Sequence, residues 1–224
     1  MLEAKKSWWF ELVFKIYNRN LLKRRFHSFR VSGLDNFVKV NSSIVYVNHS
    51  SWWDGLVAFE ISKALRADSF IMMEEKHLRN LFLFRKLGAF SVVRENPRQS
   101  VKSLNYAVNL LKEKKEKTFR TLWIFPQGEI LPNDSRPLYF YNGLAKIIER
   151  VRGCSAVPLA IRYEFLNEYK PEIFVKIGKS ENFNIIDFNS KKLTRNFESR
   201  ISKTLDELKN DVVSRNFADY KKIF

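Results

Sequence analysis

The sequence has too few cysteines for a disulfide framework and too few consecutive apolar residues for a membrane span. Cys154 is the only cysteine, which excludes an intrachain disulfide and a multi-cysteine metal site. It stands in Arg-Gly-Cys-Ser-Ala-Val-Pro, and we interpret it as a small core residue at a strand entrance rather than a nucleophile. No apolar run reaches the roughly 18 residues of a spanning helix, and the N-terminus lacks the basic-then-apolar order of a signal peptide. We therefore expect the protein to stay on the cytoplasmic side.

Acidic residues are in deficit. The 40 Lys and Arg against 24 Asp and Glu give a formal net charge of +16. Such a charge attracts anionic partners, namely nucleic acid, anionic lipid headgroups or coenzyme A, and does not choose among them. No helix-turn-helix, zinc-finger or RNA-binding signature is present, so a nucleic-acid partner is not expected. The hydrophobic content of 45% and the length of 224 residues indicate one folded domain.

The N-terminal segment has the pattern of a helix with a wide apolar face. From Ser7 to Asn18 the polar residues form a narrow stripe, and the rest are Trp8, Trp9, Phe10, Leu12, Val13, Phe14, Ile16 and Tyr17. A basic cluster that starts at Arg19 and ends at Arg30 follows. Aromatic rings beside cations suit a bilayer interface with anionic lipid, so we interpret residues 1–30 as a membrane-associating segment and 31–224 as the remaining domain. The alternative is a helix packed on the core with a solvated basic loop.

The rest of the chain alternates between short apolar runs and helix-like stretches. Strands are predicted at Ile44–Val47, Phe70–Met73, Phe90–Val93, Leu122–Phe125, Ala156–Ile161 and Ile173–Ile177. Helices are predicted near Gly55–Leu65, His77–Leu87, Val101–Lys115 and Leu144–Val151, with a longer helix from Leu193 to Val212. This alternation predicts a single α/β domain with a largely parallel central sheet flanked by helices.

The most informative motif is Asn48-His49-Ser50-Ser51-Trp52-Trp53-Asp54-Gly55, which follows the first predicted strand. If His49 lies in a loop and Ser51 caps the next helix, Asp54 in the first turn reaches one imidazole nitrogen and leaves the other as a general base. The same residues also match a capping box, in which Asp54 only satisfies backbone donors. The motif alone leaves both interpretations open.

Two further strand ends carry residues suited to a site. Phe125-Pro126-Gln127-Gly128 follows one predicted strand, and Gly128 allows a close approach of substrate to the backbone. Arg94 ends another strand and suits phosphate binding, although a surface charge is the simpler interpretation of this arginine alone. A base, a close-approach turn and a cation together favour acyl or phosphoryl transfer.

From Ile44 to Ala160 the sequence resembles the family of lysophosphatidic acid and glycerol-3-phosphate acyltransferases. Its Asn-His-x4-Asp block corresponds to Asn48, His49 and Asp54, and its Phe-Pro-Glu-Gly block to Phe125-Pro126-Gln127-Gly128. Weaker matches are Gly88-Ala-Phe-Ser-Val-Val-Arg94 and Val157-Pro158-Leu159. The resemblance implies that His49 deprotonates an acceptor hydroxyl, that Asp54 orients His49, and that the hydroxyl oxygen attacks an acyl thioester directly.

The resemblance further implies an acyl-CoA or acyl carrier protein donor as co-substrate, a lipid acceptor, and neither metal nor cofactor. It implies an O-acyltransferase of phospholipid biosynthesis with 1-acylglycerol 3-phosphate as acceptor, at the cytoplasmic face of a membrane. Arg94, Phe125, Pro126, Gln127 and Gly128 would contact substrate.

The sequence departs from the family pattern after Pro126. Gln127 replaces a glutamate, and Glu129, Ile130 and Leu131 stand where Thr, Arg and Ser are expected. Arg136 lies close along the chain, and we expect it to substitute for the missing arginine. A non-phosphorylated acceptor, such as a glycolipid, another lysolipid or an amino-lipid, remains an alternative. A non-catalytic membrane-binding protein with a decayed site is an alternative of another class.

Overall fold

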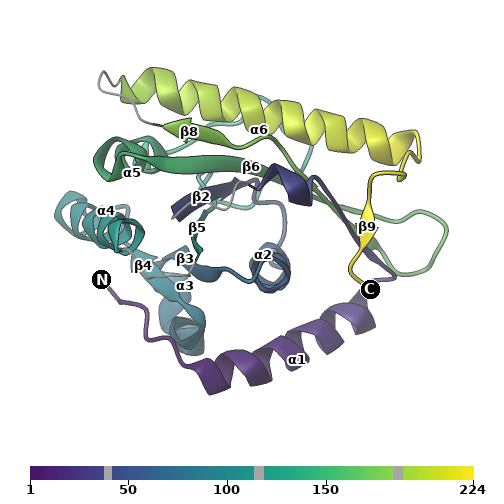
Figure 1. Cartoon of the computed structure of the whole chain (residues 1–224), viewed down its shortest axis with the longest axis horizontal. Helices are drawn as coiled ribbons and strands as arrows, with labels where there is room; N and C mark the ends of the chain where they lie inside the picture. Colours follow the sequence, from purple (N-terminus) through teal and green to yellow (C-terminus); the bar gives the residue numbers. More distant parts are fainter. Residues whose placement is uncertain (38–41, 114–118, 184–188) are drawn as a thin grey trace.

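A single mixed sheet organises the chain in the computed structural model, which describes residues 1–37, 42–113, 119–183 and 189–224 (Figure 1). Its strands are β1 (Phe29–Ser32), β2 (Ser42–Val47), β3 (Asp68–Glu74), β4 (Ala89–Val92), β5 (Arg120–Ile124), β6 (Cys154–Glu164), β7 (Glu172–Ile177), β8 (Glu181–Phe183) and β9 (Lys221–Lys222). The strand order is β4-β3-β5-β2-β6-β7-β1-β9, with β8 paired to β6.

The neighbours β4, β3, β5, β2 and β6 are all parallel, whereas β7 runs antiparallel to β6 and parallel to β1. The predicted largely parallel sheet is therefore confirmed, and each of the six predicted strands is present. The sequence did not predict β1, β8 and β9, because these strands have only two to four residues each and carry little periodicity.

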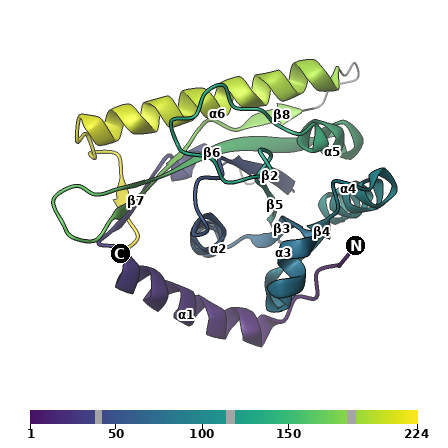
Figure 2. The ribbon, with the colours of Figure 1, turned by 180° about the vertical axis from the view of Figure 1, so that it is seen from behind.

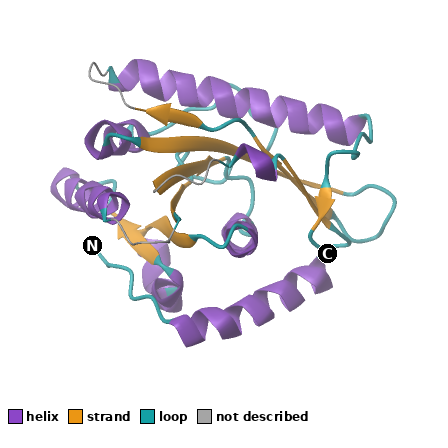
Figure 3. Ribbon diagram, viewed as in Figure 1, coloured by secondary structure: helices purple, strands orange, loops and turns teal. Residues whose placement is uncertain are grey.

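Helices cover both faces of the sheet (Figures 2 and 3). They are α1 (Trp8–Arg25), α2 (Asp54–Ala64), α3 (Glu75–Asn80), α4 (Pro97–Lys112), α5 (Gly143–Val151) and α6 (Ser190–Val213), with 3-10 turns at Leu34–Asn36 and Phe82–Leu87. Alternate side chains of β2 serve the two faces. Ile44 and Tyr46 join a core with α4, α5 and α6, and Val45 and Val47 join a core with α1 and α2.

Two predicted helices differ from those in the structure. The stretch predicted as one helix at His77–Leu87 is divided at Leu81 into α3 and a 3-10 turn. The N-terminal helix continues past Asn18 to Arg25, since no glycine or proline interrupts it, so Arg19, Lys23, Arg24 and Arg25 lie on the helix rather than after it.

The polar stripe of α1 faces inward at Glu11 and Asn18, whereas Lys15 is exposed. Glu11 pairs with Lys63 of α2, and the buried Asn18 donates from Nδ2 to the carbonyl of Leu56 at 3.2 Å. The outward face keeps the large apolar side chains exposed: Trp8, Trp9, Leu12, Val13, Ile16 and Tyr17. The alternative of a helix packed on the core stays open, because Phe14 and Leu22 of the same helix contact the core. Within the described ranges, no helix has the length and apolarity needed to cross a bilayer.

Candidate active site

The carboxyl ends of β2, β3 and β5 meet at one edge of the sheet, where open parallel sheets commonly place their sites. A cavity of about 530 Å³ lies there. Loops after β2, β4 and β5 contribute predicted site residues to its wall, and these are His49, Arg94, Phe125 and Gly128. The structure thus brings together residues that are up to 79 positions apart in the sequence (128 − 49).

His49 and Asp54 form a hydrogen-bonded pair. The distance from His49 Nδ1 to Asp54 Oδ2 is 2.8 Å, and the Asp54 carboxylate is fully buried whereas the imidazole is partly exposed. A carboxylate next to Nδ1 favours the tautomer with the proton on that nitrogen. Nε2 is then the ring nitrogen available as a base, and His49 lines the cavity.

Asp54 performs both of the roles that the motif left open. Its Oδ2 accepts the backbone N–H groups of Ser50 at 2.7 Å and Ser51 at 2.9 Å, as the acidic partner of a capping box would. The expected cap by Ser51 takes a different form, since its hydroxyl accepts the N–H of Trp53 and α2 begins at Asp54. One carboxylate therefore starts the helix and orients the imidazole.

Tyr163 is a site residue that the sequence did not reveal. Its hydroxyl donates to Asp54 Oδ1 at 2.7 Å, so that both carboxylate oxygens of Asp54 are held. Burial, the charge of Asp54 and this hydrogen bond raise the pKa of Tyr163 well above its usual range, so the hydroxyl keeps its proton. Tyr163 lies on β6, 109 positions from Asp54, and no local motif marks it.

The loop after β5 fixes the backbone of His49. The backbone N–H of His49 donates to Oε1 of the buried Gln127 at 2.7 Å, and the carbonyl of His49 accepts the N–H of Leu131 at 2.9 Å. The ring of Phe125 lies 4.7 Å from the imidazole centroid. Gln127 does not itself line the cavity, so it positions the histidine rather than touching the cavity space, and the buried Pro126 likewise lies behind the wall.

Asn48 fastens the histidine loop to the neighbouring strand. Its Oδ1 accepts the N–H of Ile161 at 2.7 Å, and its Nδ2 donates to the carbonyl of the same residue at 3.0 Å. These two bonds continue the pairing of β2 and β6 by one residue beyond Val47, where β2 ends. The asparagine of the motif is therefore structural, and His49 follows it at a fixed place.

Arg94 lies over the glycine of the turn after β5. Gly128 has φ of +75°, which favours glycine, and a Cβ atom there would lie 2.1 Å from Arg94 Nη1 and would displace the guanidinium. The guanidinium also covers the ring of Tyr141 at 5.0 Å and pairs with Glu74 Oε2 at 3.0 Å. Burial raises the pKa of the Glu74 carboxyl, but hydrogen bonds from Arg94 and Lys76 outweigh it and hold the pKa below its usual value.

Arg136 does not reach the cavity, and the expectation that it replaces the family arginine is wrong in this structure. Its guanidinium pairs with Asp206 of α6 at 2.7 Å and donates to the carbonyls of Asn133 and Ser135. Glu129 and Ile130, which depart from the family pattern, do line the cavity.

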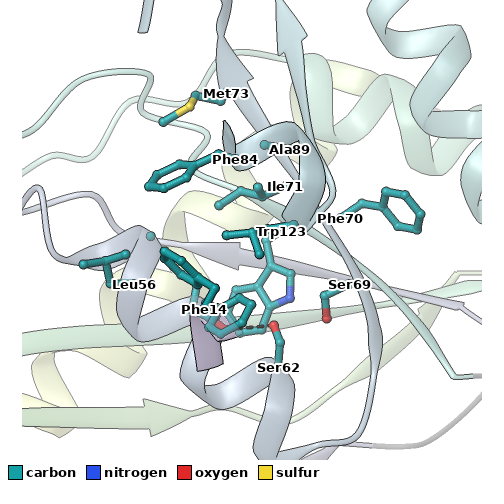
Figure 4. Close-up of a pocket in the computed structure, with 14 residues that line it drawn as sticks. Phe14, Leu56, Ser62, Ser69, Phe70, Ile71, Met73, Phe84, Ala89 and Trp123 are labelled. Atoms are coloured by element: carbon teal, nitrogen blue, oxygen red, sulfur yellow. Dashed lines mark hydrogen bonds between the residues drawn. The ribbon is translucent and has the colours of Figure 1, made fainter. Parts of the chain in front are cut away.

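A smaller apolar chamber of about 70 Å³ adjoins the cavity (Figure 4). Gly55, Leu56, Ile71, Met73 and Phe84 line both spaces. The chamber ends against Trp123 of β5 and Phe14 of α1, so the N-terminal helix forms part of its wall. In the described part of the chain, no group of three or more His, Cys, Asp and Glu side chains is placed to hold a metal ion.

The largely parallel sheet sets a histidine and a buried carboxylate beside a cavity with mostly apolar walls, an arrangement that can activate a hydroxyl next to an apolar substrate. The chain belongs to the acyltransferase family, whose model matches residues 28–162. Membership entails an acyl donor and a lipid acceptor, and it confirms the class of reaction that the motifs predicted.

One solved structure supports the fold independently. The crystal structure of the 1-acyl-sn-glycerophosphate (LPA) acyltransferase PlsC from Thermotoga maritima aligns over 89% of this chain and 79% of that chain. The TM-score is 0.66 and the sequence identity is 18%, so the two proteins share a fold across nearly the whole length described here. A comparison with curated proteins gives no significant match.

Proposed function

We propose that the protein transfers a fatty acyl group from acyl-CoA or acyl carrier protein to a hydroxyl of a glycerolipid, with 1-acylglycerol 3-phosphate as the first candidate acceptor. The observation that carries the proposal is the hydrogen bond of His49 Nδ1 to the buried Asp54 at the wall of a largely apolar cavity. The Thermotoga maritima protein of similar fold is a 1-acyl-sn-glycerophosphate acyltransferase, which supports this acceptor as the first candidate.

The proposed reaction uses His49 as a general base. Nε2 removes the proton of the acceptor hydroxyl while the hydroxyl oxygen attacks the thioester carbonyl carbon. The bond between that carbon and the sulfur breaks, and the leaving thiolate is protonated by His49. Asp54 stabilises the imidazolium formed in between. No protein nucleophile and no metal or other cofactor take part in this scheme.

The lining of the apolar chamber suits the methylene groups of an acyl chain. Its lining is formed almost entirely by carbon atoms of side chains such as Phe14, Ile71 and Trp123. Burying methylene groups there is favourable by about 0.8 kcal/mol each. We propose that the chain extends from the thioester beside His49, through the space that Leu56 and Met73 share, into this chamber.

A non-phosphorylated acceptor is the second candidate. The exposed carboxylate of Glu129 lines the cavity and would repel a phosphate dianion nearby. Ile130 stands beside it where the family has an arginine. A glycolipid, another lysolipid or an amino-lipid would avoid this repulsion.

The assay for the proposed function is acyl transfer from a labelled acyl thioester to a panel of lipid acceptors. His49→Ala should lower kcat/KM by about 10²- to 10⁴-fold, the range of a general base. His27→Ala, which changes an exposed histidine outside the cavity, is the matched control and should retain activity. Full activity of His49→Ala would refute the mechanism.

We also propose that α1 binds the cytoplasmic surface of a membrane, as a peripheral or monotopic contact with anionic lipid. Trp8 and Trp9 are exposed on a helix whose last turn carries Lys23, Arg24 and Arg25. Rings of this kind lie at headgroup depth, and the cations meet anionic headgroups. The division into a membrane-associating segment at 1–30 and an acyltransferase domain at 31–224 stays a prediction.

Liposome sedimentation tests the role of α1. Replacing both Trp8 and Trp9 with Ser should weaken binding to vesicles that contain phosphatidylserine, with little loss of folding stability, because the outer rings are exposed. Val213→Ser removes an exposed apolar side chain on α6, across the sheet, and should leave binding unchanged. Equal binding by the double variant and the native chain would contradict the proposal.

A further inference from the structure

Four charged or titratable side chains converge at one corner of the cavity, and we name Glu74, Lys76, His77 and Arg94 the Glu74 cluster. Three nitrogens surround a single carboxylate oxygen, Glu74 Oε2. Arg94 Nη2 lies at 3.0 Å, Lys76 Nζ at 3.2 Å and His77 Nε2 at 3.5 Å. All four residues line the same cavity as His49.

The Glu74 cluster has more cations than its one carboxylate can neutralise. Arg94 alone would complete an ion pair with Glu74, and its guanidinium already lies over the ring of Tyr141. Lys76 adds a full positive charge, and His77 adds a ring N–H group that is charged when protonated. Both are largely exposed, with 65% and 60% of their side-chain surfaces accessible, so their donors are not used up by the protein.

We infer that the Glu74 cluster is a binding site for a substrate phosphate, with Lys76 and His77 of α3 supplying the positive charge that Ile130 does not. The inference rests on the proposed function and names the residues that bind the charged group of its substrates. Several N–H donors that converge beside a surplus positive charge match the oxygens of a phosphate group. Glu74 holds the three nitrogens close together and keeps them from dispersing.

The Glu74 cluster offsets the negative charge that Glu129 brings to the cavity. Glu129 brings one negative charge to the cavity, and a phosphate would be repelled if Arg94 paired with Glu74 were the only cation there. With Lys76 included, the two positive charges of Lys76 and Arg94 equal the two negative charges of Glu74 and Glu129, so the charge of Glu129 is offset. A phosphate bound beside α3 therefore meets the converging N–H donors of Lys76, His77 and Arg94 without a surplus of negative charge in the cavity that contains His49.

Two substrates carry such a phosphate, namely the glycerolipid acceptor and coenzyme A. The double variant Lys76→Gln/His77→Gln distinguishes them in four pairings. The donor is palmitoyl-CoA or palmitoyl-N-acetylcysteamine, which lacks phosphate, and the acceptor is 1-acylglycerol 3-phosphate or monoacylglycerol. We expect KM to rise roughly tenfold for the substrate whose phosphate is bound, since charge-assisted hydrogen bonds are lost, with kcat nearly unchanged.

An effect that follows the acceptor phosphate assigns the Glu74 cluster to the acceptor, and an effect that follows coenzyme A assigns it to the donor. Glu129→Gln should act in the opposite direction and lower the same KM. Lys102→Gln removes one charge from an exposed position on α4, outside the cavity, and is the matched control. Unchanged KM values in all four pairings, or equal rises that include the pairing without any phosphate, would overturn the inference.

Calorimetric titration with glycerol 3-phosphate and with coenzyme A separates this inference from the proposed function. Binding of either probe by the native chain, weakened about tenfold in the double variant, supports the phosphate site even if no acyl transfer is found. Binding of both probes with equal affinity by native and variant chains overturns the site and leaves the acyltransferase proposal standing.

Discussion

The cavity has two charged regions that are built in opposite ways. Around Asp54, the polar atoms are buried and matched, with Ser50, Ser51, His49 and Tyr163 all bonded to one carboxylate. Around Glu74, the cations exceed the carboxylate and extend toward solvent. The first arrangement fixes an imidazole in one place, as a proton transfer requires, and the second leaves donors available to a ligand. The difference predicts that substitutions near Asp54 lower kcat, whereas substitutions near Glu74 raise KM.

Asp54→Ala should have the largest effect in this comparison. It removes the acceptor of two backbone N–H groups, a tyrosine hydroxyl and an imidazole, all at a fully buried position. We expect a loss of more than about 100-fold in kcat and a fall of roughly 2–4 kcal/mol in the free energy of unfolding. Activity assays and urea denaturation measure the two losses. Native stability in this variant would contradict the dual role of the carboxylate.

Gly128→Ala should come next and should affect both regions. The added Cβ would lie 2.1 Å from Arg94 Nη1 and would impose a φ of +75° on a residue with a side chain. The strain costs about 1–2 kcal/mol, and the displaced guanidinium should raise KM more than it lowers kcat. Gly143→Ala, at the start of α5 and outside the cavity, is the matched control, since its nearest atom would lie at 3.6 Å. A pure loss of kcat would show that Arg94 serves the chemistry instead.

Tyr163→Phe should have a smaller effect that is specific to the dyad. Without its hydroxyl, Asp54 Oδ1 loses its donor and the carboxylate keeps more negative charge for the imidazolium. We expect kcat to fall by roughly three- to tenfold, the worth of one hydrogen bond, and the acid limb of the kcat/KM profile to move to higher pH. A loss of activity without a change in the pH profile would mean that Tyr163 only supports packing.

Cys154→Ala should have the smallest effect. Burial raises the pKa of the Cys154 thiol to about 12, so almost no thiolate exists at neutral pH. The residue lies at the start of β6 and belongs to neither charged region. Activity should change less than about twofold, and the folded native chain should resist iodoacetamide at pH 8. Rapid alkylation coupled to inactivation would reopen the question of a covalent intermediate.

The parts of the fold and site that could be predicted are those with a local signal. Alternating apolar runs located six strands, and the His49–Asp54 spacing located the dyad, because both patterns lie within a few residues of chain. Tyr163 and the pairing of Arg94 with Glu74 could not be predicted in this way, since they depend on the pairing of strands that are distant in the sequence, although Arg94 itself was a predicted site residue. The expectation for Arg136 failed for the opposite reason. This residue lies close to the motif in the sequence, but its side chain pairs with Asp206 of α6.

The amphipathic pattern of α1 indicated two faces and could not say which one the protein would cover. Most helices on a domain bury the apolar face. Here the partners that α2 offers are Lys63 and the Leu56 carbonyl, and these select Glu11 and Asn18. Such a choice depends on tertiary contacts that periodicity does not contain.

The shared use of the Asp54 carboxylate limits how the enzyme can lose its activity without losing its structure. A change at Asp54 removes the start of α2 together with the orientation of the base, so the resulting chain is exposed to unfolding and proteolysis. A change at the His49 side chain leaves every bond to the loop backbone in place. Relatives that have become non-catalytic lipid binders should therefore be found with the histidine replaced and the aspartate retained.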